Sequence, residues 1–546
     1  MRARPLEMGS VHLTELRGSI DISQRDDVHK LKSNAVGLGG VLFACLAGAA
    51  PITAMLGNVP FGAYLGNGQG MPAAFAFATV TLVVFSVGYV AMCRKITAVG
   101  GFYTFISHGL GRVMGVASGL VGAIAYMSIE SALLGGMAYF AQITFESRFG
   151  WVIPWPWFAL IGLAIIAVLT YFDVDLSLKV LGVALASEVA ILLLMDFGIL
   201  FQGAGKDFAA GDINVVGKGL NAAALNPANA FKNAGTTGAA AALGVFMAFW
   251  SWVGFEAAPN YAEESRDPAR NVPRATYISV VGLGVFYTFT SWMVVSAWGA
   301  KSNVEAAGGL GPDFFYTPTT VYIGKFFTKL MGWLIISGSL ACGMAFHNAA
   351  TRYWYAMGRE GLLPRRLGKT HPVHKSAYVA SGFQSVLALV LVLVYMFAGK
   401  VDGGTTQEWT FNAAYLGAYT QMAVLATYLL LILQTLVSIG IIRYFRDHPD
   451  AHPWKTLVAP AIATLMQLYV IYLLFSNLDN IGGTKGFTPY IAWTGLGIIA
   501  VGILVSLYLR SAKPDVYENI GRYVNRGDAE LSKGDVITGP LADEFH

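Results

Sequence analysis

Charged residues are scarce in this sequence. Asp, Glu, Lys and Arg make up 12% of its 546 residues, about half of the ~25% that is usual in soluble globular proteins. Residues of the AVILMFWYC set make up 55%, and mean hydropathy is +0.56. A soluble multidomain protein is therefore excluded, and most of the chain is expected to lie in a lipid bilayer. The net charge of +4 is too small and too dispersed for a nucleic-acid-binding surface.

Cysteine and catalytic motifs are also lacking. Cys45, Cys93 and Cys342 lie far apart in or beside apolar runs, which excludes a disulfide framework and a zinc knuckle. The chain has no HExxH, CxxC, GxSxG or Gly-rich phosphate loop, so the sequence predicts no enzyme, cofactor or metal site. His371 and His374 are three residues apart, but Pro372 breaks the helix that would align their rings, which favours a solvated loop.

Long apolar runs dominate what is present. Residues 1–33 contain no short apolar core followed by a small-residue cleavage site, so no signal peptide is predicted. Twelve apolar runs of about 18 to 29 residues are each long enough to cross ~30 Å of hydrocarbon as a helix. They lie at 35–57, 72–93, 113–141, 155–172, 178–201, 238–258, 276–299, 330–355, 376–398, 413–441, 457–477 and 488–510.

The distribution of Lys and Arg predicts the orientation. The loops on one side hold nine of the 36, and the remainder lie on the side that includes both termini. Both termini are therefore expected in the cytoplasm, in a multi-pass protein of the cell membrane. The expected organisation is a cytoplasmic segment over 1–33, a ten-helix core over 34–455, helices 11 and 12 over 456–510 and a cytoplasmic tail over 511–546.

Two of the predicted spans contain interruptions. The first reads LFACLAGAAPITAML, with Pro51 in mid-span, and is expected to break near Ala49 and to restart with Pro51 as the first helical residue. The sixth reads FMAFWSWVGFEAAPNYAEE. Gly254 permits an unwound backbone there, and the Glu256 carboxylate needs a cavity or a partner at that depth.

Either interruption alone is compatible with a kinked packing helix, because Gly and Pro are common in membrane spans. Interruptions five spans apart, however, indicate an inverted repeat of five plus five helices with a substrate site near the midplane. The N–H groups at a half-helix N-terminus suit a carboxylate, and unwound carbonyls suit an ammonium group.

Three segments resemble one family of transporters. The run FWSWVGFEAAPNYAEE from Phe249 to Glu264, continued by SRDPARNVPRAT, is similar to the sixth-helix signature of the amino acid, polyamine and organocation transporter superfamily. TRYWYAMGREGLLP from Thr351 to Pro364 resembles the end of the eighth helix in its bacterial amino acid permeases. GGFYTFISHGLG from Gly100 to Gly111 resembles the Gly-Gly-aromatic start of the third helix.

The resemblance implies a proton-coupled symporter or an exchanger of amino acids or amines that works by alternating access. Trp250 lies in the pattern WSxxGxE, in which the Trp of arginine-type exchangers stacks over the substrate, whereas Trp252 is interpreted as a packing residue. The first helix has Gly48-Ala49-Ala50-Pro51 in place of the usual Gly-Ser-Gly or Gly-Thr-Gly. The predicted substrate site comprises Gly48, Ala49, Ala50, Thr53, Trp250, Ser251, Val253, Gly254 and Phe255.

Buried acidic residues are candidates for coupling and for substrate contact. Glu188 stands where many family members have a Lys that takes the place of a bound cation, so Glu188, together with Glu256, is the predicted coupling residue. The coupling ion is expected to be a proton, with sodium as the alternative. A cavity-facing Glu130 would pair with a second ammonium of a cationic substrate; the alternative is a carboxyl group that is protonated or bonded to Ser128 or Ser131. His347 is interpreted as a packing residue.

A channel and a membrane enzyme are the alternative classes of function. A channel would need a continuous polar pore, and a membrane enzyme has no catalytic motif to start from. The unlike interrupted helices favour a carrier, with saturable flux in proteoliposomes as the test. The sequence does not select the amino acid or amine, nor does it separate symport from exchange.

Overall fold

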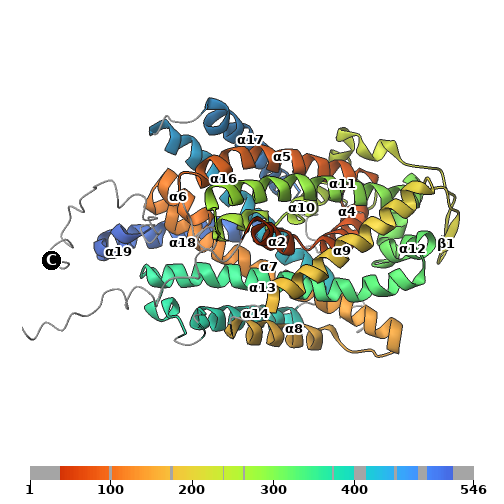
Figure 1. The fold of residues 1–546 in the computed structure, drawn as a ribbon, viewed down its shortest axis with the longest axis horizontal. Coiled ribbons are helices and arrows are strands. Elements are labelled where there is room, and N and C mark those ends of the chain that lie inside the picture. The colour runs from red at the N-terminus through yellow and green to blue at the C-terminus, as the bar shows by residue number, and fades with distance from the viewer. Residues whose placement is uncertain are drawn as a thin grey trace, which may run out of the picture.

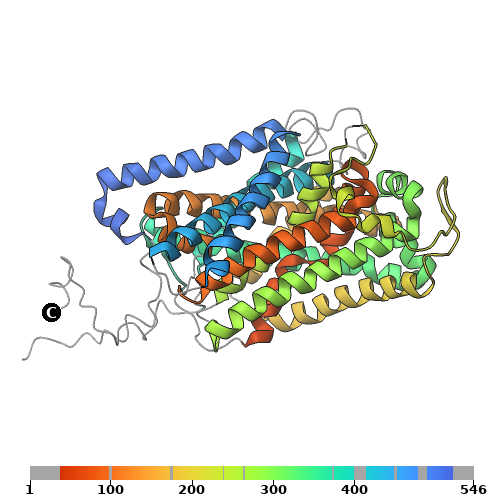
Figure 2. The ribbon, with the colours of Figure 1, turned by 90° about the horizontal axis from the view of Figure 1, so that it is seen from above.

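Helices that run roughly side by side make up nearly the whole of the computed structural model (Figures 1 and 2). It describes residues 37–96, 101–172, 176–237, 239–261, 265–371, 374, 376–398, 413–447, 452–477 and 488–520. Within them, eight helices are long and apolar enough to cross a membrane. The prediction of an all-α polytopic membrane protein is confirmed at that level. The terminal segments predicted as cytoplasmic lie largely outside the described residues.

The first predicted span breaks where the proline pattern indicated. Helix α2 (Leu38–Ala49) ends just before Ala50, which has a positive φ of 38°. Helix α3 (Pro51–Thr53) then begins with proline, whose missing N–H is not needed at a first helical position. The chain continues as a π-helical turn, η2 (Ala54–Asn58), and as α4 (Val59–Leu65). The expected break near Ala49 and restart at Pro51 are confirmed.

The sixth predicted span is helical over only part of its length. Helix α10 (Ala241–Trp250) gives way to a turn over 251–254, in which Gly254 has φ of 115°. A 3₁₀ segment, η6 (Phe255–Tyr261), follows in place of a resumed α-helix. Residues with a Cβ rarely adopt this φ, so glycine is the residue type that this turn requires.

The remaining elements before the sixth span are α5 (Met71–Cys93), α6 (Phe102–Leu110), α7 (Arg112–Phe149), α8 (Trp155–Tyr171) and α9 (Leu176–Phe201). Those after it are α11 (Pro268–Gly309), α12 (Asp313–Tyr322), α13 (Lys325–Arg359), α14 (Tyr378–Ala398), η8 (Ala413–Gln421), α16 (Met422–Asp447), η9 (Trp454–Val458), α17 (Ala459–Phe475), α18 (Thr488–Ala512) and α19 (Pro514–Asn519).

Several helices extend beyond the apolar runs that predicted them. The run at 276–299 belongs to α11, which begins at Pro268 and, after a bend at Gly299 (φ 73°), continues to Gly309. Hydropathy detects only the part of a helix that suits hydrocarbon. The polar residues at both ends of α11 are also helical, but an apolar run cannot show this.

Short elements gather at the two ends of the bundle. One end carries the antiparallel strands β1 (Phe208–Ala210) and β2 (Ile213–Val215), near α12, and α6 and α19 lie toward the other end (Figure 1). The long 203–235 connection also holds η4 (Ala222–Leu225) and η5 (Pro227–Phe231), and the connection before α14 holds η7 (Arg365–Gly368). The sequence did not predict the hairpin.

Burial separates central from peripheral helices. In the most apolar stretch of each helix, 83% of the residues are buried in the helix formed by η8 and α16, and 72% in α7, against 28% in α18. Helices α7 and α16 therefore form the protein-facing centre. The peripheral helices present apolar side chains outward, as lipid contact requires.

Candidate substrate-binding site

The two interrupted helices touch through their backbones. A Cβ atom placed on Gly254 would lie 2.7 Å from the carbonyl carbon of Gly48 and 3.1 Å from the backbone nitrogen of Ala49. A Cβ on Gly48 would in turn lie 3.2 Å from the Cα of Gly254. Neither position has room for a side chain without displacing backbone, so this pair of glycines sets how closely the two breaks approach.

Side chains from neighbouring helices satisfy the carbonyls that the first break frees. The Gly48 carbonyl accepts a hydrogen bond from the Cys342 thiol on α13 at 3.0 Å, and the Ala49 carbonyl accepts one from the Tyr287 hydroxyl on α11 at 3.0 Å. A freed backbone group inside a membrane is costly unless it is paired. Side chains of these two helices therefore pair with carbonyls that the break removes from the helical hydrogen bonding.

A small cavity lies where the breaks meet. Seven residues of the predicted site line it, namely Gly48, Ala49, Ala50, Thr53, Trp250, Ser251 and Val253. Two others do not: Gly254 packs on the Gly48 backbone, and Phe255 lines a second, mostly apolar space beside Trp252. The remaining lining residues, which sequence reasoning missed, are Ala54, Asn58, Ile129, Leu133, Cys342, Phe346 and Tyr419.

One wall of the cavity is a chain of hydrogen bonds. The indole N–H of Trp250 donates to the Tyr419 hydroxyl at 3.2 Å, and that hydroxyl donates to Oδ1 of Asn58 at 2.6 Å. Nδ2 of Asn58 donates to the Ser251 hydroxyl at 2.7 Å. The chain ties α10 to both the first span and the η8 segment. It also holds Trp250, which is 6% exposed, at the cavity.

Much of the remaining lining is apolar. Ile129 and Leu133 come from α7, Cys342 and Phe346 from α13, and Val253 from the turn after α10. The Phe346 ring stacks on Tyr126 with ring centroids 5.9 Å apart. Among the described residues that line the cavity, none is Asp, Glu, Lys or Arg. The lining therefore offers hydroxyl, amide and backbone groups, but no full charge.

Glu256 lies beside the break of the sixth span rather than in the cavity. Its Oε2 accepts the Gly254 N–H at 2.9 Å and its Oε1 accepts the Tyr126 hydroxyl at 3.1 Å. The Tyr89 hydroxyl donates to the Glu256 carbonyl at 2.9 Å. The carboxyl group is thus part of the turn itself, and a change in its protonation would alter the bonds that hold Gly254.

Glu188 lies behind the break of the first span. It is 3% exposed, and it packs so tightly on α13 that a Cβ on Gly338 would lie 2.3 Å from its Oε1. Its carboxylate is hydrogen-bonded by the backbone of Ile52, but Oε2 has no hydrogen-bond partner among the described residues. Thr53 follows Ile52 on α3, and Ser339 follows Gly338 on α13. The hydroxyl groups of Thr53 and Ser339 are hydrogen-bonded to each other at 2.8 Å, which joins these two helices.

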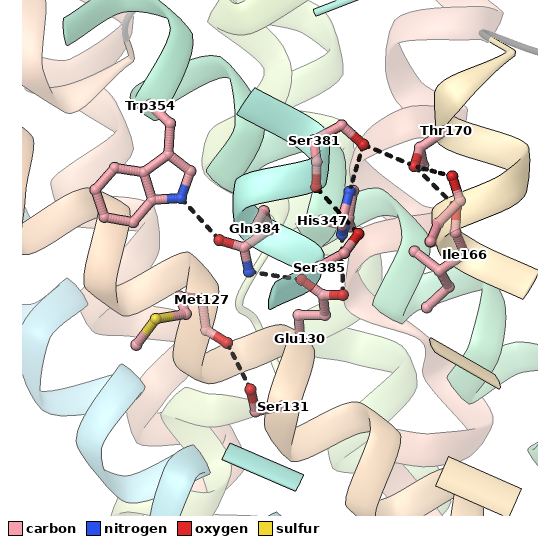
Figure 3. A network of polar contacts seen from close by, with 11 residues as sticks. Met127, Glu130, Ser131, Ile166, Thr170, His347, Trp354, Ser381, Gln384 and Ser385 are labelled. Atoms are coloured by element: carbon pink, nitrogen blue, oxygen red, sulfur yellow. Dashed lines mark hydrogen bonds and ion pairs between the residues drawn. The ribbon is translucent and has the colours of Figure 1, made fainter. Parts of the chain in front are cut away.

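The structure does not place Glu130 at the cavity. It is not among the residues that line the cavity, and its carboxylate oxygens bond to His347 on α13 and to Gln384 on α14 (Figure 3). Neither of the alternative serine partners contacts it, since Ser128 and Ser131 donate to carbonyls of their own helix. The expectation of a cavity-facing Glu130 is therefore corrected: this carboxylate is already occupied.

Trp252 is fully buried away from the cavity of the two breaks. Its ring packs edge-on against Tyr287 with centroids 5.1 Å apart, and its N–H donates to the Val280 carbonyl at 3.4 Å. This agrees with its interpretation as a packing residue. Of the residues missed, Asn58 follows directly after the first apolar run, and the structure continues the helix through it, so its amide needs a partner within the protein.

A family model described as amino acid permease matches residues 43–502 of this chain. Similar curated proteins include the low-affinity putrescine importer PlaP of Escherichia coli K12, 25% identical over 373 residues that cover 64% of this chain and 74% of the relative. The branched-chain amino acid permease BcaP of Bacillus subtilis 168 is 23% identical over 449 residues, which cover 79% of this chain and 85% of the relative. The methylthioribose transporter of B. subtilis 168 is 23% identical over 269 residues, which cover 47% and 48%.

The glycine contact can be tested with Gly254→Ala. A residue with a Cβ at this φ is strained by about 1–3 kcal/mol, and the added methyl group would push the two breaks apart. We expect at least a ten-fold loss of transport and a lower apparent melting temperature, measured by uptake into proteoliposomes and by thermal unfolding of the purified protein.

The matched control is Gly282→Ala in α11, where an added Cβ meets nothing within 4 Å. This variant should retain the transport and stability of the unmodified protein. Full activity of Gly254→Ala would show that the breaks do not depend on this contact.

Proposed function

Because the chain belongs to the amino acid permease family, we propose that it is a secondary active transporter that moves amino acids across the cell membrane by alternating access and is driven by protons. That the protein is a multi-pass transporter follows from the family and its relatives. The twelve spans, the five-plus-five inverted repeat and the cytoplasmic termini belong to the proposal. So do the division at residues 33, 455 and 510, and the absence of enzymatic activity.

The observation that carries the proposal is the cavity at the meeting point of the two breaks. In transporters with interrupted helices, the substrate site lies where the breaks meet, near the middle of the membrane. In alternating access, one group of helices moves against another around that site. Breaks in the first and sixth spans, joined by a contact of glycine backbones, suit such a movement better than two continuous helices do.

The lining supports a substrate with an apolar side chain. Ile129, Leu133, Val253 and Phe346 would surround that side chain, and no carboxylate lines the described cavity to meet a second ammonium. A relative named as a branched-chain amino acid permease agrees with this class. A diamine is the second candidate, favoured by the relative named as a putrescine importer, but a dication would enter this cavity without a charged partner, at a high desolvation cost.

Competition should separate these substrates. In proteoliposomes, unlabelled leucine, isoleucine or valine should inhibit uptake of labelled leucine at concentrations at least ten-fold lower than putrescine or arginine requires. Saturation of that uptake would also distinguish a carrier from a channel. Saturable uptake of labelled putrescine, with no inhibition by leucine, would contradict the proposed class.

Trp250 is proposed as the aromatic cover of the substrate. Trp250→Leu should raise the KM for uptake roughly ten-fold, because aromatic contacts contribute about 0.5–1.5 kcal/mol beyond simple burial. Trp250→Phe, which retains a ring but loses the N–H donated to Tyr419, is the matched control and should change KM less. Surface expression of both variants should be normal. An unchanged KM for Trp250→Leu would show that Trp250 does not cover the substrate.

Glu188 is proposed as the proton-coupling residue, with Glu256 assisting at the other break. Glu188 contacts two helices that would move relative to each other, since it lies against the restart of the first span and against Gly338 of α13. Relative movement of these helices would change its surroundings, so the carboxyl group can bind a proton in one access state and release it in the other. Its Oε2 has no hydrogen-bond partner among the described residues, so a proton bound there displaces no hydrogen bond.

Glu188→Gln should separate coupling from transport. Uptake by this variant should no longer respond to an imposed pH gradient, while exchange of internal for external substrate continues. Asp196→Asn changes a buried carboxylate on the same helix, bonded to Thr290 of α11, and should retain the response. Accumulation by Glu188→Gln equal to that of the unmodified protein would exclude Glu188, and loss of uptake in sodium-free buffer would identify sodium as the coupling ion.

A further inference from the structure

A second small cavity meets the substrate cavity at the turn of the sixth span. The two linings share one residue, Val253. The other residues of the sixth span that line the second cavity are Phe249, Trp252 and Phe255. Its remaining lining comes from α5 and α16, namely Leu82, Thr427, Leu430, Leu431 and Gln434. Among the described residues, Val253 is therefore the one that lies between the two spaces.

The chemistry of the second cavity favours apolar groups. None of its described lining residues is Asp, Glu, Lys or Arg. The Thr427 hydroxyl donates to the Ala423 carbonyl of its own helix at 2.7 Å, and Oε1 of Gln434 accepts a hydrogen bond from Nε2 of Gln467 on α17 at 3.0 Å. The charged ends of an amino acid would lose their hydration there without gaining a charged partner. The space therefore suits the end of an apolar or aromatic side chain.

Packing holds the aromatic walls of the second cavity in place. Trp252 is 0% exposed, and its ring contacts those of Phe75 and Tyr287, with centroids 5.8 and 5.1 Å away. Phe255 packs edge-on against Phe85, with centroids 6.2 Å apart. When a buried side chain is shortened, its surroundings relax only partially into the space that is left. Space opened beside these rings is therefore expected to stay open.

The backbone fixes the position of Val253. Its N–H donates to the Trp250 carbonyl at 3.1 Å, and the next residue, Gly254, is packed against the backbone of Gly48. Valine is branched at Cβ, which restricts the rotamers of its side chain. Val253 therefore has little freedom to move aside for a larger substrate unless the contact between the two breaks is disturbed.

We propose that Val253 determines specificity by separating the two cavities, and that it thereby limits how far the substrate side chain reaches. With valine at this position, the site takes aliphatic side chains of the size of valine, leucine and isoleucine. A smaller residue would join the cavities and admit an aromatic ring into the apolar second space. This inference rests on the proposed transport of apolar amino acids, and it adds the residue that sets their upper size.

Val253→Ala should shift selectivity from aliphatic toward aromatic amino acids. In proteoliposomes that take up labelled leucine, the concentration of unlabelled phenylalanine that halves uptake should fall about ten-fold relative to that of valine, because a change of one methylene in an apolar pocket alters selectivity by about this factor or more. Val253→Ile extends the boundary instead and should shift selectivity from leucine toward valine. The two variants change selectivity in opposite directions, so the test does not depend on the folding of either one.

The matched control is Leu431→Ala. Leu431 is 1% exposed and lines the second cavity alone, so its truncation enlarges that space but leaves Val253 in place. Selectivity of this variant should equal that of the unmodified protein. A shift as large as that of Val253→Ala would show that the two cavities are already joined and that Val253 does not separate them.

Thermal unfolding of the purified protein gives a second readout that does not require transport. Phenylalanine should raise the melting temperature of Val253→Ala more than that of the unmodified protein, because a ligand that binds the folded state stabilises it. Equal rises, or unchanged selectivity in both Val253 variants, would overturn the inference while leucine uptake by the unmodified protein continues. If leucine is neither taken up by the unmodified protein nor stabilises it, the proposed substrate class is itself wrong, and this inference fails with it.

Discussion

The contact between the backbones of Gly48 and Gly254 is the constraint on which the site depends. It allows two broken helices to approach where side chains would keep them apart. Once they meet, the carbonyls freed at the first break need partners, and Tyr287 and Cys342 supply them from α11 and α13. The cavity is the space that remains between these groups. Ala50, with its positive φ, adds local strain at the same point, as is common where structure serves function.

Polar groups in hydrocarbon must find partners within the protein, and this requirement gives three buried glutamates different surroundings. Glu256 is built into the turn at Gly254 and receives two hydrogen bonds. Glu130 is held by His347 and Gln384. Glu188 retains one oxygen without a partner among the described residues. Of the three, Glu188 is therefore the carboxylate whose surroundings can change most easily when helices move.

A buried polar network joins α7, α8, α13 and α14 (Figure 3) and consists of Glu130, Thr170, His347, Ser381 and Gln384. The network and the broken helices have complementary properties. The network fixes four helices to one another through hydrogen bonds that leave neither Glu130 nor His347 without partners. The interrupted spans contact that unit across the cavity, through apolar side chains on one side and the Trp250 to Ser251 chain on the other. Four helices joined by buried hydrogen bonds, packed beside two interrupted helices, are an arrangement that suits the proposed alternating access.

Apolar run length and Pro51 were enough to predict membrane helices and the break after Ala49, because these features act locally on the backbone. The seven predicted residues that line the cavity required, in addition to the two interruptions, the family resemblance around Trp250. The partners of Glu130 could not be predicted: His347 and Gln384 lie 217 and 254 residues away in sequence, and apolar spans do not reveal which helix faces are neighbours. The same holds for Tyr419 and Phe346, which complete the cavity from distant helices. The amino-acid sequence alone determined which stretches are long and apolar enough to cross a membrane and where the first span breaks, since both depend on neighbouring residues. Tertiary packing was needed to decide that no carboxylate lines the described cavity, that Glu130 and Glu256 are hydrogen-bonded, and that Glu188 retains an oxygen without a partner among the described residues. These outcomes depend on the packing of helices that are far apart along the chain.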